Sequence, residues 1–209
     1  MKKHYSQLIE AVVFDIGEVL VKLDFSPVLR ELGLPPSLPL YEALGRLEGW
    51  NPFDSFERGT LSKEEFLKTL SSLAGRELSW ECFLPIWNSV IVGPFPLTEE
   101  LLKKLSSKVP LFALTNSNEF HYKFLKETYP WMSYFAQVFS SHLIGARKPE
   151  DKVFRHVLET IRLLPSKILF IDDRFENVKA AKTLGFVAEL CEQLNGNLFS
   201  IVSKHGFVC

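Results

Sequence analysis

Four polar groups in this sequence carry the side chains that an ionic reaction site needs: carboxylates, a hydroxyl, an amide and an ammonium group. Three of the groups come directly after short apolar stretches, and the fourth lies in a loop before a helical pattern. In chain order they are Asp15, Thr115 with Asn116, Lys148, and Asp172 with Asp173. Two adjacent carboxylates repel each other, and burial raises that cost, so a bound cation would stabilise the pair. Oxygen ligands with room for water suit Mg²⁺.

Each of these groups has a structural explanation when it is considered alone. An aspartate after a strand commonly closes a turn or caps a helix, as Asp15 would. Thr115 and Asn116 are also good helix caps, and Lys148 fits a solvated surface position. Capping does not explain why all four groups occur together in this order, so the joint pattern favours a reaction site.

The apolar stretches before these residues predict the elements that position them. AVVF, VPLFAL, FAQVF, KILFI and FVAEL are short, apolar and rich in strand-forming residues, and helical patterns lie between them. This alternation predicts an α/β fold with a parallel sheet flanked by helices. Ligands bind such sheets outside the carboxyl ends of the strands, so we expect the polar groups to meet at one edge.

The sequence between residues 24 and 95 has a different character, because its patterns are helical and no equally strong strand occurs there. The stretch VGPFP at the end of this part is rich in Pro and Gly and predicts a connector. We therefore predict a helical domain at 24–95, inserted after the first strand, and a core domain made of 1–23 and 96–209.

The overall composition excludes several classes of protein. The 209 residues are 46% hydrophobic and 23% charged, which is enough apolar material for a packed core. Lys plus Arg (24) nearly balances Asp plus Glu (25), so charge predicts neither a nucleic-acid nor a membrane partner. The three widely spaced cysteines predict no disulfide framework, and no early apolar run is long enough for a signal peptide or membrane span. We expect a cytoplasmic monomer or homodimer.

The motifs FDIGEVL, LTNS, RKP and FIDD, in this order and with a helical insert after the first, resemble the haloacid dehalogenase (HAD) superfamily of hydrolases. The resemblance covers nearly the whole chain and implies a Rossmann-like HAD core with a C1-type helical cap. Within the superfamily, the Gly in FDIGEVL, the ERG turn and the RKPE stretch are most similar to small sugar-phosphate phosphatases of the alpha-D-glucose-1-phosphate phosphatase type.

The resemblance implies a Mg²⁺-dependent phosphatase that acts on a small phosphorylated metabolite, such as glucose 1-phosphate, through an aspartyl-phosphate intermediate. In the family pattern Asp15 is the nucleophile, Thr115 and Asn116 bind and orient the phosphoryl group, and Lys148 neutralises charge. The implied metal ligands are Asp15, the carbonyl of Gly17, Asp173 directly and Asp172 through water, with Asn177 as support.

Gly17 departs from the pattern of most family phosphatases, which have a second aspartate at this position. The backbone carbonyl for the metal is kept, but the carboxyl that transfers a proton is lost. Proton transfer would then depend on Glu18, a substrate group or water. Missing acid–base help costs about 10²–10⁴-fold in rate. A good leaving group, such as an anomeric oxygen, would reduce that loss, which is consistent with a sugar 1-phosphate.

The predicted helical domain would cover the site, exclude water and select the substrate. Arg58, in the sequence FERGT, is a candidate for binding a sugar or a second phosphate from that domain. An arginine in such a turn is equally well explained as a solvent-facing residue.

Two other functions compete with a phosphatase. A 2-haloacid dehalogenase would share the fold and the nucleophilic Asp15 but would use no metal, and the adjacent acids Asp172 and Asp173 argue against it. A protein that binds a phosphorylated ligand with little turnover would explain Gly17, but the retained Asp15, Thr115, Lys148 and Asp173 favour catalysis.

Overall fold

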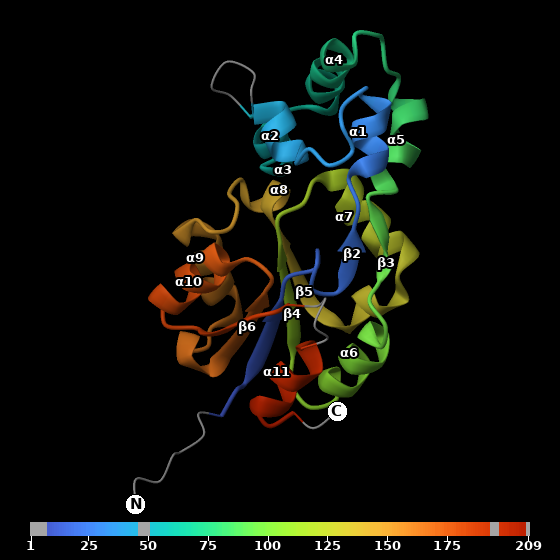
Figure 1. The fold of residues 1–209 in the computed structure, drawn as a ribbon. Coiled ribbons are helices and arrows are strands. Elements are labelled where there is room, and N and C mark those ends of the chain that lie inside the picture. The colour runs from blue at the N-terminus through green and yellow to red at the C-terminus, as the bar shows by residue number, and fades with distance from the viewer. Residues whose placement is uncertain (1–7, 46–50, 193–196, 208–209) are drawn as a thin grey trace, which may run out of the picture.

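A computed structural model describes residues 8–45, 51–192 and 197–207 of the chain (Figure 1). Its centre is a five-stranded sheet with the strand order β5-β4-β1-β6-β7. All neighbouring strands in this sheet are parallel. The strands are β1 (Ala11–Phe14), β4 (Leu111–Thr115), β5 (Phe135–Ser140), β6 (Ile168–Asp172) and β7 (Val187–Leu190).

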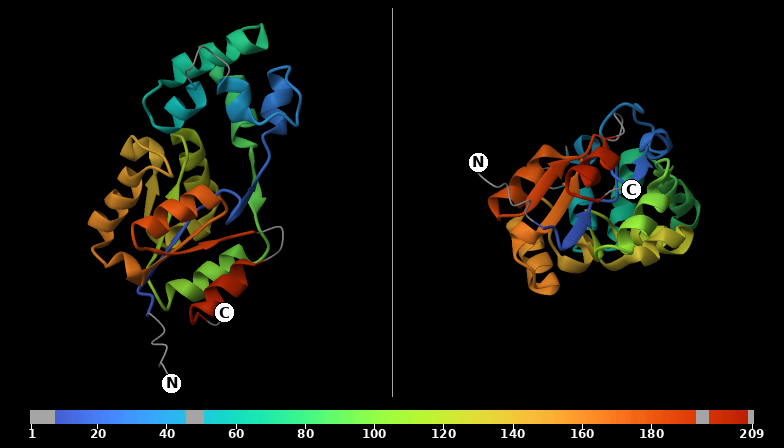
Figure 2. Two further views of the ribbon diagram at one scale, coloured as in Figure 1. Left: turned by 60° about the vertical axis from the view of Figure 1, so that its left-hand side comes forward. Right: turned by 90° about the horizontal axis from the view of Figure 1, so that it is seen from below.

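Helices cover both faces of this sheet, as the alternation of the two patterns predicts. One buried cluster joins Val12 and Phe14 of β1 to α6 (Thr98–Ser106), α7 (Glu119–Thr128) and α11 (Leu198–Lys204). The other joins Ala11 and Val13 to α9 (Asp151–Ile161) and α10 (Phe175–Thr183). Seen from below in Figure 2, α9 and α10 lie on one side of the sheet and α6 and α11 on the other. The predicted α/β fold is confirmed.

A second, two-stranded sheet joins the central sheet to a helical segment. β2 (Val21–Leu23) pairs antiparallel with β3 (Ile91–Pro94). The expectation that VGPFP is only a connector was therefore wrong for its first residues. A proline fits an edge strand, where its missing N–H costs no ladder bond, and the pairing depends on a partner about 70 residues away that local pattern does not reveal.

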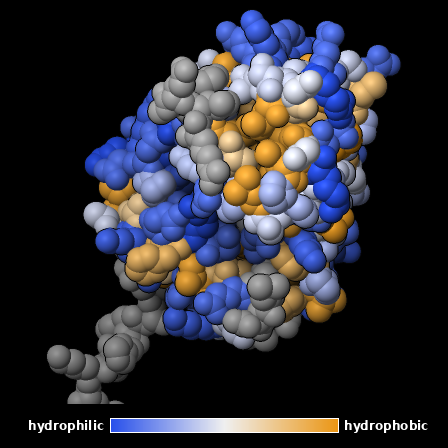
Figure 3. All heavy atoms as spheres, turned by 45° about the horizontal axis from the view of Figure 1, so that its top comes forward, coloured by the Kyte–Doolittle hydropathy of each residue, from blue (hydrophilic) through white to orange (hydrophobic). Residues whose placement is uncertain are grey.

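Among the residues that the structure describes between β2 and β3 there are five helices, grouped at the upper end of the molecule in Figure 1. We call them the α1–α5 segment. The helices are α1 (Ser26–Glu31), α2 (Leu40–Gly45), α3 (Pro52–Glu57), α4 (Lys63–Ala74) and α5 (Trp80–Asn88). Figure 3 shows an apolar area at this end of the molecule with hydrophilic side chains around it.

Aromatic side chains form the core of the α1–α5 segment. Trp87 is completely buried, and its ring meets those of Phe53, Phe66 and Phe83 at centroid distances of 6.0, 5.2 and 6.0 Å. Such edge-to-face and offset pairs add to the free energy gained by burying large apolar rings. The segment therefore has a hydrophobic core separate from the two clusters of the central sheet.

The same tryptophan connects the α1–α5 segment to α7 of the central unit. The ring of His121 stacks on Trp87 at 4.9 Å, and its Nε2 donates to the Trp87 carbonyl at 2.8 Å. The amide of Asn118 lies 3.1 Å from Nδ1 of the same imidazole. Both ring nitrogens of a neutral His121 are thus satisfied, and burial lowers its pKa to about 4.

None of the helices that the structure describes combines the length and the apolar character needed to cross a membrane.

Replacing Trp87 with alanine should lower the free energy of unfolding by about 3–5 kcal/mol, because it leaves a large cavity in the aromatic core. Urea unfolding followed by circular dichroism measures the change. Phe175→Ala is the matched control, because Phe175 is 67% exposed and its loss should change stability by less than about 0.5 kcal/mol. Equal effects of the two changes would contradict the packing described here.

His121 makes the stability of the protein depend on pH in the acidic range. Its pKa is about 4 in the folded state and about 6.5 when unfolded. Between pH 4 and pH 6.5, His121 is therefore protonated in the unfolded chain and neutral in the folded chain. The contribution of His121 is complete above pH 6.5, and up to about 3 kcal/mol is lost as the pH falls to 4. Urea midpoints at several pH values should show a smaller acid loss for His121→Gln than for the wild type.

Candidate active site

The strand order of the central sheet brings the predicted polar residues together. β1 lies between β4 and β6, and all three strands run in the same direction. Asp15 follows β1, Thr115 ends β4, and Asp172 ends β6 with Asp173 next to it. Their side chains therefore gather at the carboxyl edge of the sheet, as predicted.

Lys148 reaches this edge from the loop between α8 (Ser141–Ile144) and α9. Its Nζ lies 2.8 Å from Asp15 Oδ2 and 2.7 Å from Asp172 Oδ2, and the residue is only 4% exposed. The ammonium group thus bridges two carboxylates that would repel each other strongly in a buried site without it.

The side chain of Asn116 fixes the backbone of Lys148. Asn116 Oδ1 accepts from the Lys148 N–H at 2.8 Å, and Asn116 Nδ2 donates to the Lys148 carbonyl at 3.1 Å. Both ends of the Asn116 amide thus hold the lysine backbone in place. Asn116 also lines the cleft described below, and its role in orienting a phosphoryl group stays a prediction.

Asp172 is completely buried, and protein groups occupy both of its oxygens. Lys148 binds Oδ2, while Oδ1 accepts from Asn177 Nδ2 at 2.8 Å and from the Arg174 N–H at 2.9 Å. Asn177 therefore supports the acidic pair, as predicted. The neighbouring carboxylate of Asp173 is less buried and lines the cleft described below.

Asp15, Asp172 and Asp173 each offer an oxygen within 4.8 Å of the others, and we call them the three-carboxylate cluster. Without a bound cation, burial raises the pKa of Asp15 to about 8, against the pull of Lys148 and with the help of the other two acids, and a divalent cation at this site would lower it again. Burial and Asp172 raise the pKa of Asp173 to about 6. One lysine leaves a surplus of negative charge, and hard oxygen donors in this arrangement fit a divalent cation such as Mg²⁺.

A cleft of about 170 Å³ opens over the cluster. Asp15, Thr115, Lys148 and Asp173 are among its polar wall residues. The α1–α5 segment and the strand before it add an apolar wall, made by Leu23, Phe25 and Phe53. The cleft thus combines an ionic floor with an apolar side, which suits a small anionic ligand that also has carbon atoms to bury.

Gly17 and Glu18 form the turn between β1 and β2. A Cβ at Gly17 would lie 2.8 Å from Leu23 Cδ1, so the leucine occupies the space where a side chain would begin. Glu18 has a positive φ of 55°, and its Oε1 accepts from the Leu23 N–H at 2.6 Å. Its carboxylate therefore closes the turn.

Arg58 was predicted to bind the substrate, and the structure does not place it among the residues that line this cleft. Its guanidinium lies 2.5 Å from Asp54 and 2.7 Å from Glu150. Arg147 lines the cleft instead, and it pairs with Asp54 and, at 2.6 Å, with Glu57.

Sequence reasoning did not select Glu57 and Arg147, although each is adjacent to a residue that it did select. The sequence did contain a signal for both residues: Glu57 precedes Arg58 in ERG, and Arg147 precedes Lys148 in RKP. Which member of each pair turns toward the cleft depends on how the helices and loops pack, and adjacent side chains of a helix point in different directions.

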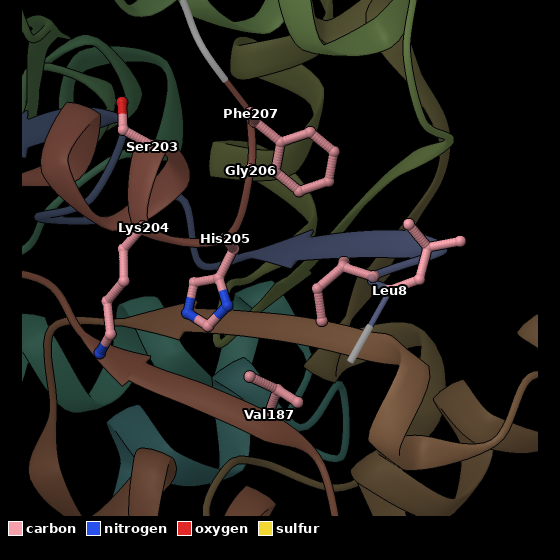
Figure 4. A pocket seen from close by; sticks show the side chains of 8 residues that line it. Leu8, Val187, Ser203, Lys204, His205, Gly206 and Phe207 are labelled. Carbon is pink, nitrogen blue, oxygen red and sulfur yellow. The ribbon is translucent and has the colours of Figure 1, made fainter. Parts of the chain in front are cut away.

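A larger hollow, of about 510 Å³, lies at the opposite edge of the sheet (Figure 4). It is lined by residues that precede β1 or begin β7, together with the end of α11, such as Leu8, Val187 and His205. Lys204 and His205 both contact Glu189 there, at 2.7 and 2.8 Å. This hollow does not contact the three-carboxylate cluster, so its size does not make it the reaction site.

Known proteins resemble this chain in sequence and in structure. D-ribitol-5-phosphate phosphatase from Bacteroides thetaiotaomicron is 29% identical over 192 residues, which cover 86% of this chain and 90% of that protein. A sesquiterpene phosphatase from Aspergillus oryzae is 28% identical over 182 residues, with coverage of 85% and 87%.

A HAD family enzyme from Bacteroides thetaiotaomicron, solved in complex with magnesium and inorganic phosphate, has the same fold. It is 27% identical to this chain with a TM-score of 0.76, covering 87% of this chain and 93% of that chain. The three-carboxylate cluster has the ligand chemistry to hold the same ion here.

The family model of haloacid dehalogenase-like hydrolases matches residues 9–185, which include all the site residues at the carboxyl edge of the sheet. Together with the fold and the acidic cluster, this match shows that the chain belongs to the haloacid dehalogenase-like hydrolase family.

Proposed function

We propose that this protein is a Mg²⁺-dependent phosphatase that removes the phosphoryl group from a small phosphorylated metabolite. The observation that carries the proposal is the burial of Lys148 between Asp15 and Asp172, beside a third carboxylate. This arrangement provides a nucleophile, a fixed cation and a place for a divalent metal around one small volume. The phosphatases among the relatives support the same reaction.

Asp15 is the nucleophile of this proposal, and attack of its carboxylate on phosphorus forms an aspartyl-phosphate that water then hydrolyses. The Ile16 N–H donates to Asp15 Oδ1 at 2.7 Å, and Lys148 holds Oδ2. These two contacts fix the carboxylate before the substrate arrives, which lowers the entropic cost of attack.

When bound, Mg²⁺ would supply positive charge to the phosphoryl oxygens and draw them toward Asp15. Asp15, the Gly17 carbonyl and Asp173 would hold it directly, and Asp172 would act through water. Asp172 suits an indirect role because Lys148, Asn177 and Arg174 already occupy its oxygens. Thr115 would donate its hydroxyl to the phosphoryl group, while Asn116 acts through the backbone of Lys148.

The substrate that we propose is a sugar phosphate, such as glucose 1-phosphate. The cleft volume of about 170 Å³ suits a molecule of this size, and one relative is named for ribitol 5-phosphate. The name of the sesquiterpene phosphatase, together with the apolar wall of Leu23, Phe25 and Phe53, makes a phosphorylated terpenoid the second substrate class to test.

The helical domain predicted at 24–95 acts as a cap in this proposal. Phe25 and Phe53 line the cleft from above the sheet edge, so the α1–α5 segment would exclude water from the phosphoryl group. Arg58 acts here by binding Asp54 and Glu150, and so attaches α3 to the loop that follows Lys148.

Neither of the other two functions has comparable support. Attack on the carbon of a 2-haloacid requires no metal, so a dehalogenase would not explain the surplus negative charge of the three-carboxylate cluster. A binding protein without turnover would not need Asp15 to be fixed for attack.

Asp15→Asn should reduce the rate of phosphate release by on the order of 10⁴-fold or more, because an amide is not a nucleophile at neutral pH. Inorganic phosphate released from 4-nitrophenyl phosphate and from glucose 1-phosphate in the presence of Mg²⁺ measures the rate. Asp24→Asn is the matched control, since Asp24 is exposed and its carboxylate accepts hydrogen bonds from the neighbouring Ser26. Turnover by Asp15→Asn at the wild-type rate would contradict the proposal.

Removing the metal with a chelator should stop phosphate release, and added Mg²⁺ should restore it. Asp173→Asn should raise the Mg²⁺ concentration needed for half-maximal rate by at least about tenfold, because a direct ligand is lost. Asp151→Asn, which changes an exposed carboxylate on α9, should leave this concentration unchanged. Full activity in chelator, with release of halide from a 2-haloacid, would instead support the dehalogenase.

A further inference from the structure

Cleaving an alkyl phosphate requires a proton for the leaving oxygen. An aliphatic alkoxide is about as strong a base as hydroxide, so its departure without a proton is slow at neutral pH. Gly17 has no side chain to supply this proton, and Leu23 fills the space next to it. Another group in the cleft must do so if the protein acts on alkyl esters.

Four carboxylates line the cleft among the described residues: Asp15, Glu18, Glu57 and Asp173. Asp15 and Asp173 belong to the three-carboxylate cluster and face the place proposed for the metal. Glu18 closes the β1–β2 turn through its short hydrogen bond from Leu23. Glu57 is therefore the carboxylate that lines the cleft without a role in the metal site or in the turn.

Glu57 lies at the end of α3, which places it on the α1–α5 segment and opposite the strand ends. It is only 6% exposed, and it lines both the cleft and a smaller adjoining hollow of about 50 Å³. Its backbone carbonyl accepts from Ser141 Oγ at 2.6 Å, which attaches the end of α3 to the central unit. The end of α3 that carries Glu57 is therefore held against the central unit at the cleft.

The charges around Glu57 favour a proton on its carboxyl group. Three carboxylates share two guanidinium groups here: Arg147 contacts Asp54 and Glu57, and Arg58 contacts Asp54 and Glu150. One negative charge is in excess, and Glu57 is the most buried of the three acids.

The contact between Glu57 and Arg147 does not cancel this preference. Arg147 Nη2 lies 2.6 Å from Glu57 Oε2, but this oxygen has no hydrogen-bond partner of good geometry among the described residues. Burial raises the pKa of Glu57, Arg147 and Lys148 oppose the shift, and Asp54 adds to it, with a net rise.

We propose that Glu57 is the general acid that protonates the leaving oxygen, in place of the side chain that Gly17 lacks. This role rests on the phosphatase function proposed above. The carboxyl group that serves the leaving oxygen then comes from the α1–α5 segment and not from the β1 turn.

The proton and electron pairs balance in both halves of the reaction. As an Asp15 oxygen bonds to phosphorus, the bond from phosphorus to the leaving oxygen breaks, and the Glu57 proton passes to that oxygen to give an alcohol. In the second half, the Glu57 carboxylate takes a proton from water as the water oxygen bonds to phosphorus. The bond between Asp15 and phosphorus then breaks, which releases inorganic phosphate and restores protonated Glu57.

The test compares two esters that differ in their need for a proton. 4-Nitrophenolate is a stable anion at neutral pH, so it leaves without a proton. An alkyl phosphate, such as ribitol 5-phosphate or glycerol phosphate, must instead receive a proton on its leaving oxygen. Glu57→Gln should lower kcat/KM for the alkyl ester by about 10²–10⁴-fold and change that for 4-nitrophenyl phosphate less than about threefold. Because kcat/KM covers only the steps through the first irreversible step, the later attack by water does not obscure the comparison.

The pH profile gives a second readout that a purely structural role would not change. For the wild type, kcat/KM on the alkyl ester should fall on the alkaline side as Glu57 loses its proton, and this limb should be absent from Glu57→Gln. Glu64→Gln is the matched control, because it removes an exposed carboxylate of the α1–α5 segment that belongs neither to this ionic network nor to the cleft lining. It should retain both the alkyl-ester activity and the alkaline limb.

Three results would overturn the proposal. An equal loss on both esters would assign Glu57 to structure or positioning, and no loss on either would remove it from the reaction. The selective loss appearing in Glu18→Gln instead would make Glu18 the acid. If the wild type hydrolysed neither ester with Mg²⁺, the phosphatase function itself would fail, which is a result distinguishable from these three.

Discussion

The ammonium group of Lys148 is buried between two carboxylates, and the rest of the site is arranged around this contact. Three acids within 4.8 Å of one another would not remain ionised together in a buried place without a cation. The sheet brings the acids together because β1 lies between β4 and β6, and Asn116 holds the backbone of the lysine that compensates them. The surplus negative charge that remains is the physical reason to expect a divalent metal.

A second group of charges connects the α1–α5 segment to this centre. Arg147 directly precedes Lys148, and its guanidinium contacts Asp54 and Glu57 of α3. Adjacent residues of one loop thus reach in two directions: Lys148 contacts Asp15 and Arg147 contacts α3. The position of the α1–α5 segment and that of Lys148 are therefore mechanically linked, and Trp87 with His121 provides a further attachment through α7.

The cleft between these two groups determines which chemistry is available. Its floor is ionic, its wall contains Leu23, Phe25 and Phe53, and Glu57 lies on the side of the α1–α5 segment. Leu23 has two effects at once, because its side chain covers the space next to Gly17 and its N–H donates to the Glu18 carboxylate. In the proposal for Glu57, the acidic group of the site comes from α3 and not from the β1 turn.

The sequence by itself determined the sheet, the residues at its carboxyl edge and their convergence. Strand periodicity is local, and parallel strands necessarily end at one edge, so Asp15, Thr115 and Asp172 had to meet. Only the tertiary structure decided that Asn116 binds the backbone of Lys148, that Ile91–Pro94 pairs as a strand, and that Arg147 and Glu57 line the cleft in place of Arg58. These features depend on contacts such as that between Asp54 and Arg147, which are 93 residues apart. Side-chain direction across such a distance follows from packing, and no local pattern encodes it.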